Sequence, residues 1–172
     1  AITFNNIGNK VAYSELSRRD FIPMNMKIGN SFTVQNNSYN KITFSVDLQR
    51  LLVPTPAKYI VVDGENILIS GKPNDIGVIA GMLQSFSDAP GTVLEDEDGN
   101  YIQNEDGTYA IAKWSRLKEE LSEINIAAGV EWWYNDVFAL RSGIFYESKN
   151  KGNRQFLNLG ASLKYNAFAI DF

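Results

Sequence analysis

The 172-residue chain contains no cysteine and no histidine. Without cysteine there is no disulfide framework and no thiolate metal site. Without histidine the chain lacks the most common general base and metal ligand, so neither a Ser-His-Asp nor a Cys-His catalytic arrangement is possible within it. We expect a protein that is not an enzyme, with no catalytic residues, no metal site and no cofactor.

Positive charge is also scarce, because 16 lysines and arginines stand against 20 aspartates and glutamates, a formal net charge of −4. This balance argues against a nucleic-acid partner, which would favour a basic surface. The chain also lacks a run of about eighteen apolar residues, so we expect no transmembrane helix. Strands of a membrane barrel are only half apolar, so the lack of a long apolar run does not argue against such a barrel.

What the chain does contain is alternation. From Ile124 to Phe172 apolar and polar residues alternate in four segments, 124–134, 138–146, 157–165 and 168–172, separated by short turns. Side chains alternate with period two along a strand, so the pattern predicts an antiparallel β-meander with one apolar and one polar face. The same alternation at 24–34 and 41–51, and a further strand within 1–7, bring the total to about seven strands.

Three features favour a transmembrane barrel over a half-buried soluble sheet. The segments are about ten residues long, which is enough for a tilted strand to cross a bilayer. Short and long connections alternate, as they do in outer-membrane barrels. The polar face carries charges suited to a lumen, namely Lys27, Asp47, Glu131, Arg141, Lys164 and Asp171.

We predict that these six residues line the lumen and that opposite charges pair across strands. One register of the 24–51 hairpin places Lys27 beside Asp47. A three-residue loop at 135–137 places Glu131 opposite Arg141. An arginine neighbour keeps a carboxylate ionised, which makes the second pair a poor general acid.

Tyrosine stands directly before asparagine at each of three short turns, and Trp132 lies close to one of them. A ring that is apolar with one polar edge suits the membrane–water interface. We therefore predict an aromatic girdle, and we prefer it to an aromatic ligand cage at 132–134. Its members are Tyr39, Trp132, Tyr134 and Tyr165.

The region 52–122 interrupts the alternation. It is expected to hold a small hairpin at 59–70, a helix at 76–86 capped by Asp75, two Asp-Gly turns in an acidic stretch, and a helix at 114–122. Residues 95–100 resemble a calcium loop but lack its final glutamate, so a solvated acidic turn is the better interpretation. We predict an extracellular loop whose candidate partner-binding residues are Pro54, Pro56, Met82 and Phe86.

Several stretches of the sequence are distinctive together: DFIPMNMKIG at 20–29, LLVPTP at 51–56, FSDAPG at 86–91, KEEL at 118–121, EWWYN at 131–135 with ALR at 139–141, GNRQF at 152–156 and LKYN at 163–166. In these stretches the chain resembles the PorV family of the Bacteroidota type IX secretion system.

The resemblance implies an all-β fold, an antiparallel transmembrane β-barrel of the bacterial outer membrane, related to the FadL fatty-acid transporters. Such proteins accept secreted clients at the type IX translocon by the client's C-terminal signal domain and carry them to a surface attachment complex. Their barrels have about fourteen strands. We therefore expect residues 1–172 to be one barrel domain segment of a longer chain, in lipid contact, with 52–122 as a loop insertion.

Two other functions stay open at this point. A FadL-like channel for hydrophobic small molecules would need an apolar lumen, whereas the predicted inward face is polar. A soluble β-rich binding domain would need a second layer to cover the apolar rows around Trp132 and Leu157.

Overall fold

The computed structural model describes residues 1–12 and 19–172, and it divides into two compact units. The first comprises residues 1–3, 27–50 and 124–172, and the second comprises residues 4–26 and 51–123. The sequence after the first predicted strand, with its glycine, serines and charged residues, predicts a loop through Asp20. Residues 13–18 of this loop lie outside the described residues. The prediction of one domain with an insertion at 52–122 stays a prediction.

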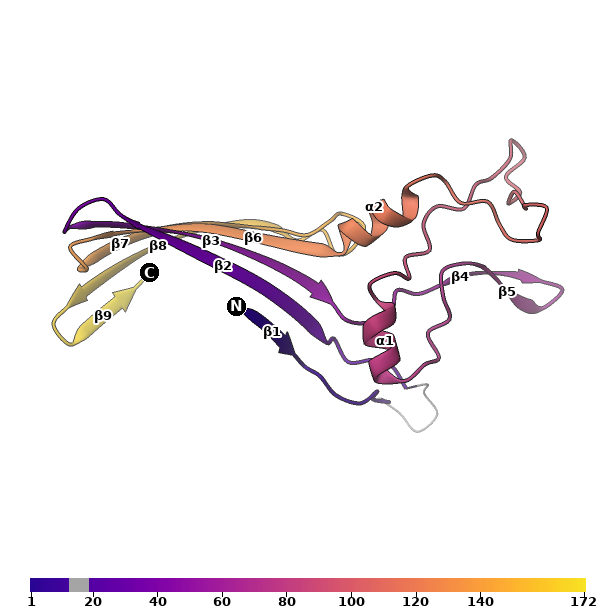
Figure 1. The fold of residues 1–172 in the computed structure, drawn as a ribbon, viewed down its shortest axis with the longest axis horizontal. Helices are drawn as coiled ribbons and strands as arrows, with labels where there is room; N and C mark the ends of the chain where they lie inside the picture. The colour runs from indigo at the N-terminus through magenta and orange to yellow at the C-terminus, as the bar shows by residue number, and fades with distance from the viewer. Residues whose placement is uncertain (13–18) are drawn as a thin grey trace. The chain divides into compact units, whose positions relative to one another are not determined.

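The first unit is organised by a seven-stranded sheet with the order β1-β2-β3-β6-β7-β8-β9 (Figure 1). Within the described residues β1 and β9 are its two edges, so the sheet is open and not a closed barrel. The antiparallel β-rich class is confirmed. The strands are β1 (Ile2–Asn5), β2 (Asn25–Gln35), β3 (Asn40–Leu51), β6 (Ile124–Tyr134), β7 (Phe138–Tyr146), β8 (Gln155–Tyr165) and β9 (Phe168–Asp171).

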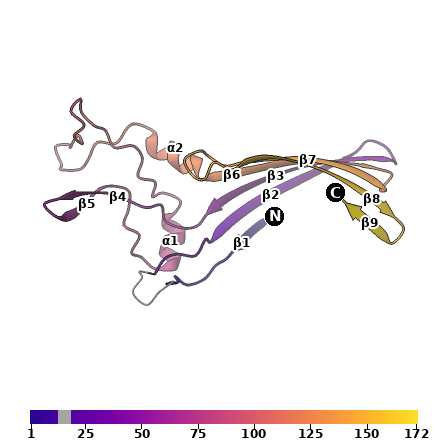
Figure 2. The ribbon, with the colours of Figure 1, turned by 180° about the vertical axis from the view of Figure 1, so that it is seen from behind.

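Short turns set the register of the hairpins. Asn135 and Asp136 both have positive φ, 52° and 53°, in the three-residue turn between β6 and β7. Asn166, in the turn between β8 and β9, also has a positive φ, 52°. Asparagine and aspartate tolerate this left-handed conformation better than other residues with a side chain. Strands β3 and β6 pair in the same antiparallel manner, although more than 70 residues separate them. Figure 2 shows the long strands side by side from behind.

The second unit contains two short helices and a two-stranded sheet. The hairpin predicted at 59–70 is confirmed as β4 (Lys58–Val62) and β5 (Glu65–Ser70), and the helix predicted at 114–122 as α2 (Ser115–Ser122). The first helix, α1, covers only Val78–Gln84. Asp75 as its cap is wrong, because the N-cap position is Gly77 and Asp75 lies too far from the first turn to bind its N–H groups.

The core of this unit is small and combines apolar side chains with a few buried polar ones, among them Ser85 and Asp88. Met24 and Leu52 are fully buried and joined by a 2.8 Å hydrogen bond from the Leu52 N–H to the Met24 carbonyl. Gly81 of α1 lies so close to Phe21 and Pro54 that an added Cβ would come within 2.6 Å of the Phe21 ring. Glycine at this position therefore allows the helix to approach these two side chains.

The acidic stretch forms a three-cornered β-structure built on an eight-residue repeat. The backbone N–H of Leu94 donates to Ala110, that of Ala110 to Ile102, and that of Ile102 to Leu94, at 2.8, 2.9 and 3.0 Å. Two corners are Asp-Gly turns, with Gly99 and Gly107 at φ 82° and 81°. The β-excursion predicted here is confirmed.

Candidate functional site

The sheet of the first unit presents two faces of opposite character. Cross-strand registers place Phe44, Val130, Ser142 and Leu159 in one row, and Thr43, Glu131, Arg141 and Gly160 in the next. Neighbouring rows of an antiparallel sheet point to opposite sides. The predicted division into an apolar and a polar face is therefore present across β3, β6, β7 and β8.

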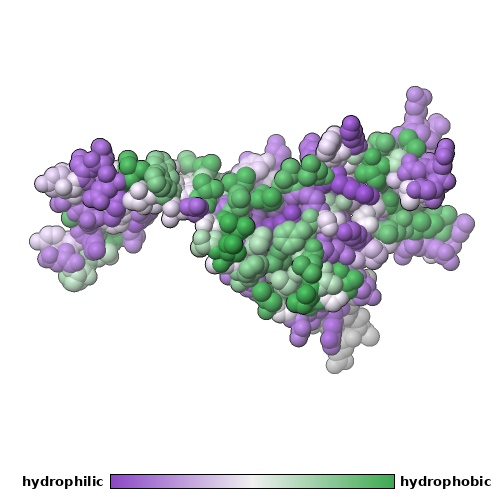
Figure 3. Space-filling view, viewed as in Figure 1, coloured by the Kyte–Doolittle hydropathy of each residue, from purple (hydrophilic) through white to green (hydrophobic). Residues whose placement is uncertain are grey.

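The apolar face is exposed along its whole width. Leu159 is 76% exposed and Leu157 is 64% exposed, and apolar side chains reach the surface over the sheet in the space-filling view (Figure 3). Other exposed members are Phe32, Phe44, Val46, Val130, Leu140, Ile144, Leu163, Phe168 and Ile170. A continuous surface of this kind marks contact with another protein or a membrane.

The polar face holds its charges in cross-strand pairs. Lys27 Nζ lies 2.6 Å from Asp47 Oδ2, as the sequence predicted. Arg141 is the centre of a second group: it pairs with Glu131 directly opposite, and its Nη1 lies 3.1 Å from Asp171 Oδ1.

Ser162 joins the second group by donating to Asp171 and accepting from Arg141. The structure therefore brings five of the six predicted lumen residues into two ion-pair groups. Lys164 shares their face but makes no ion pair with the described residues. The lumen itself stays a prediction.

A hollow of about 440 Å³ lies on this polar face between the two groups of charges. Ser45, Gly129, Gly143 and Asn158 form a cross-strand row of mostly small side chains at its floor. Glu131 and Arg141 also line it. The hollow offers hydrogen-bonding groups and paired charges, and no nucleophile with an adjacent base.

The four predicted girdle residues lie at the end of the sheet where the short turns are. Tyr39, Tyr134 and Tyr165 are half or more exposed, and Trp132 donates its Nε1–H to Asn40 Oδ1 at 3.1 Å. The structure thus groups the aromatic residues at one level of the sheet. Their contact with lipid stays a prediction.

The four candidate partner-binding residues differ in accessibility. Pro56 and Phe86 are exposed, Met82 is half-buried, and Pro54 is buried beside Gly81. The most exposed apolar side chains of α1 are instead Ile79 and Leu83, about 70% exposed each. The observed helix is short, and this side of it is left exposed.

Sequence reasoning missed a buried carboxylate beside the sheet. Glu147, which follows β7, is only 4% exposed and accepts hydrogen bonds from Arg154 Nε and Nη2, both at 2.8 Å. These bonds hold the pKa of Glu147 below its usual value of 4.5. Gly152 is required here, because an added Cβ would lie 2.8 Å from the Glu147 carboxyl carbon.

A second buried carboxylate, Asp88, lies in the second unit and is 1% exposed. Its Oδ2 accepts the N–H of Thr55 at 3.0 Å, whereas its Oδ1 has no hydrogen-bond partner among the described residues. Burial raises the pKa of Asp88, and the charges of Glu120 and Glu123 raise it further.

Acidic residues of α2 bind the same loop. Glu120 accepts the N–H of Ala89 and Glu119 accepts that of Gly91, at 2.8 and 2.9 Å. The FSDAPG stretch is therefore held by two carboxylates of α2, and its own Asp88 carboxylate binds Thr55. Within the described residues no group of three or more acidic side chains is placed to hold a metal ion.

Comparison with known protein families finds a match to the N-terminal part of the chain. Residues 1–58, which include β1, β2 and β3, match the family model described as type IX secretion system protein PorV. The match confirms the predicted resemblance and supports a role in type IX secretion in general terms. It is consistent with a location in the cell envelope. No curated protein matches the chain. No helix in the described part of the chain is both long and apolar enough to cross a membrane.

Proposed function

We propose that this chain forms part of an outer-membrane β-barrel that accepts type IX secretion clients by their C-terminal signal domain and passes them to the surface attachment complex. The role is that of a carrier and not of an enzyme. The observation that carries the proposal is the broad, exposed apolar face of the sheet, opposite a face whose charges are paired.

The energetics of the apolar face favour lipid over water as its surroundings. Burying one large aliphatic or aromatic side chain stabilises a protein by about 1.5–3 kcal/mol, and more than ten such side chains of the sheet are exposed. The long strands have 9 to 12 residues. About 9–11 residues are needed to cross a bilayer at the usual tilt.

The polar face supports the same proposal. Ion pairs between Lys27 and Asp47, and between Arg141 and Glu131, fill the side of the sheet that would face a lumen. The same charges argue against a FadL-like channel for hydrophobic molecules, since an apolar ligand in the hollow would strip water from Glu131 and Arg141 without replacing its hydrogen bonds. A soluble domain would require a second layer over Leu157 and Leu159, both mainly exposed.

The contact with clients or with the translocon is proposed to involve the segment 52–122. Phe86, Met82 and Pro56 remain candidates, joined by Leu83 because of its exposure. Pro54 is buried, so its alanine variant reports on packing beside Gly81 rather than on contact. This distinction provides a built-in control.

The test is capture of a client C-terminal signal domain and of the translocon by the tagged protein, extracted in detergent from cells that carry a type IX system. Phe86→Ala and Leu83→Ala should each lower capture by about fivefold, roughly 1 kcal/mol, the loss expected for one contributing interface side chain. Val61→Ala, on β4, removes an apolar side chain of similar exposure and should leave capture unchanged.

Two results would count against the proposal. Capture at the wild-type level by both Phe86→Ala and Leu83→Ala would show that neither α1 nor the residues that directly follow it are the contact. Absence of capture by the wild-type protein itself would exclude the carrier role.

A further inference from the structure

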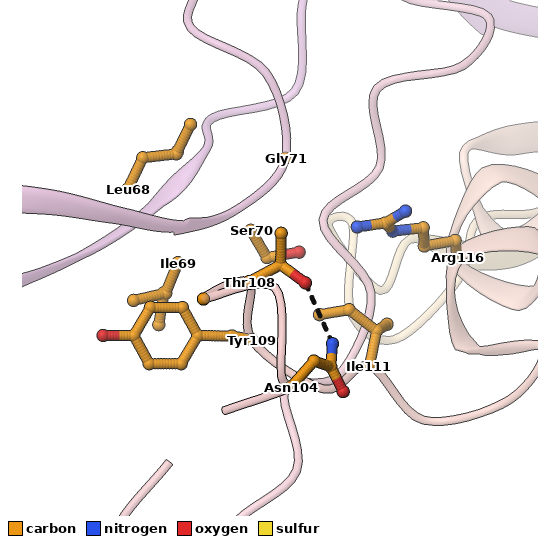
Figure 4. Close-up of a pocket in the computed structure, with 10 residues that line it drawn as sticks. Leu68, Ile69, Ser70, Gly71, Asn104, Thr108, Tyr109, Ile111 and Arg116 are labelled. Carbon is orange, nitrogen blue, oxygen red and sulfur yellow. Dashed lines mark hydrogen bonds between the residues drawn. The ribbon is translucent and has the colours of Figure 1, made fainter. Parts of the chain in front are cut away.

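The second unit contains a cavity of about 530 Å³ that the carrier role does not use. Its walls are the end of β5, residues 68–71, and the segment 104–111 of the three-cornered β-structure, with Arg116 of α2 beside them (Figure 4). The volume is in the usual range for ligand-binding pockets. Each wall includes a β-segment, the end of β5 on one side and the bridged residues Tyr109 and Ile111 on the other, and the second wall also includes the turn at 105–107.

One wall has backbone groups without partners. The hydrogen bonds from Ala110 to Ile102 and from Ala112 to Thr92, at 2.9 and 2.8 Å, use the residues on either side of Ile111. Successive residues of an antiparallel strand direct their N–H and C=O groups to opposite edges. The backbone N–H and C=O groups of Tyr109 and Ile111 therefore point to the other edge of the strand. In the described part of the chain these groups make no hydrogen bond.

Arg116 supplies an unpaired cation at the same cavity. Its stem packs against Gly91, where an added Cβ would come within 2.8 Å of Arg116 Cγ. The guanidinium makes no ion pair or hydrogen bond within the described residues, although three glutamates lie on the same helix or at its end. Figure 4 shows the side chain directed from α2 toward the other lining residues.

The acidic turn that borders the cavity is already satisfied. Asp106 Oδ1 accepts both the N–H of Thr108, at 2.9 Å, and its hydroxyl, at 2.6 Å. These bonds lower the pKa of Asp106, with the Thr108 hydroxyl contributing most. The carboxylate is thus held by its own turn and is not the partner of Arg116.

We propose that this cavity binds an extended peptide segment that carries a carboxylate. The peptide backbone would pair with the free edge at Tyr109 and Ile111, as in strand addition to an exposed sheet edge. The carboxylate would accept paired hydrogen bonds from the Arg116 guanidinium, whose planar fork matches it. This inference does not depend on the proposed secretion role.

The probe is a fluorescein-labelled Thr-Val-Thr-Val-Thr-Val peptide, measured by fluorescence anisotropy with the full chain in detergent. Three forms are compared: a free C-terminal carboxylate, a C-terminal amide, and an amide in which one internal threonine is glutamate. If the protein recognises a C-terminal carboxylate, the peptide with the free C-terminus should bind at least tenfold more tightly than the plain amide. If it recognises a side-chain carboxylate, the glutamate-containing amide should bind at least tenfold more tightly than the plain amide.

Arg116→Gln should remove this preference and leave the affinity for the plain amide within twofold. Lys118→Gln removes an exposed cation from the same helix, outside the cavity, and should change neither affinity. Equal binding of all three peptides by the wild-type protein, no binding of any of them, or an unaltered preference in Arg116→Gln would each overturn the proposal.

The eight-residue repeat provides a matched test of the backbone edge. Ile111→Pro removes one of the unpaired N–H groups and should weaken the carboxylate and amide peptides alike, by about fivefold. Gln103 occupies the equivalent position one repeat earlier, outside the cavity, and its N–H is also unpaired. Gln103→Pro should bind as the wild type does, and equal losses in both proline variants would contradict strand addition. The edge-to-face contact of Tyr101 and Tyr109, followed by near-ultraviolet circular dichroism, verifies that each variant is folded.

Discussion

The two units of this chain bury opposite kinds of side chain. In the sheet, Leu159 is exposed while Arg141 and Glu131 pair on the other face. In the second unit, Met24 and Leu52 are buried, and the acidic turns around Gly99 and Gly107 are exposed. The second unit follows the rule for a protein in water, and the sheet reverses it.

If the proposed membrane location of the sheet is right, the two units of this chain are suited to two different surroundings. The second unit gains stability by removing apolar area from water, as any small domain does. The sheet leaves such area outside and pairs most of the charges on its other face. In the proposed membrane location, the apolar surroundings would make this arrangement favourable. The composition of the whole chain does not reveal this difference, because it does not record which apolar residues are buried and which are exposed.

The largest expected effect comes from a charge on the apolar face. Leu159→Arg should destabilise the sheet in lipid vesicles by about 2–4 kcal/mol, the usual cost of arginine near the bilayer midplane on the lipid face of a barrel. Asn158→Arg, the neighbouring position on the polar face beside the hollow, should cost much less. Folding is followed by heat-modifiable gel migration across a urea series. Equal stability of the two variants would show that the apolar face does not contact lipid.

The faces that this experiment compares were predictable from the sequence, and so was their register. Period-two alternation assigned each side chain to a face, and the short Asn-Asp turn after Tyr134 made Glu131 oppose Arg141, as observed. Both signals are local, which is why they survive in a single sequence. Strand ends were less exact: β8 begins at Gln155, two residues before the predicted start.

The buried carboxylates could not be predicted in this way. Thr55 and Asp88 are 33 residues apart when they meet, and Glu147 meets Arg154 across a loop. No periodicity brings such partners together. The ring through Leu94, Ile102 and Ala110 was hidden for another reason, because backbone groups form it and the side chains at these positions share no pattern beyond the repeat.

A smaller loss of stability is expected when the buried carboxylate of Glu147 loses its ion-pair partner. Arg154→Ala leaves Glu147 buried without its cation, and proteolysis between β7 and β8 should become several-fold faster. Adding Glu147→Gln should restore much of the resistance, because the charge is then gone. Folding lowers the pKa of Glu147 below 4.5, so in the wild type the pair stabilises the loop above pH 4.5 and loses this effect as the pH falls through the folded pKa. Additive losses in the double variant would contradict this account.

The smallest effect has the opposite sign and belongs to the second unit. Burial raises the pKa of Asp88 above 3.8, so the ionised carboxylate destabilises the folded unit at neutral pH, and the penalty disappears as the pH falls through the folded pKa toward 3.8. Asp88→Asn retains an acceptor for the Thr55 N–H and removes the charge. Hydrogen exchange at Thr55 should therefore be slower in the variant at pH 7, and the difference should shrink on acidification. Faster exchange in the variant at pH 7 would mean that Asp88 is held as a favourable charge, as Glu147 is, and the contrast between the two buried carboxylates would be lost.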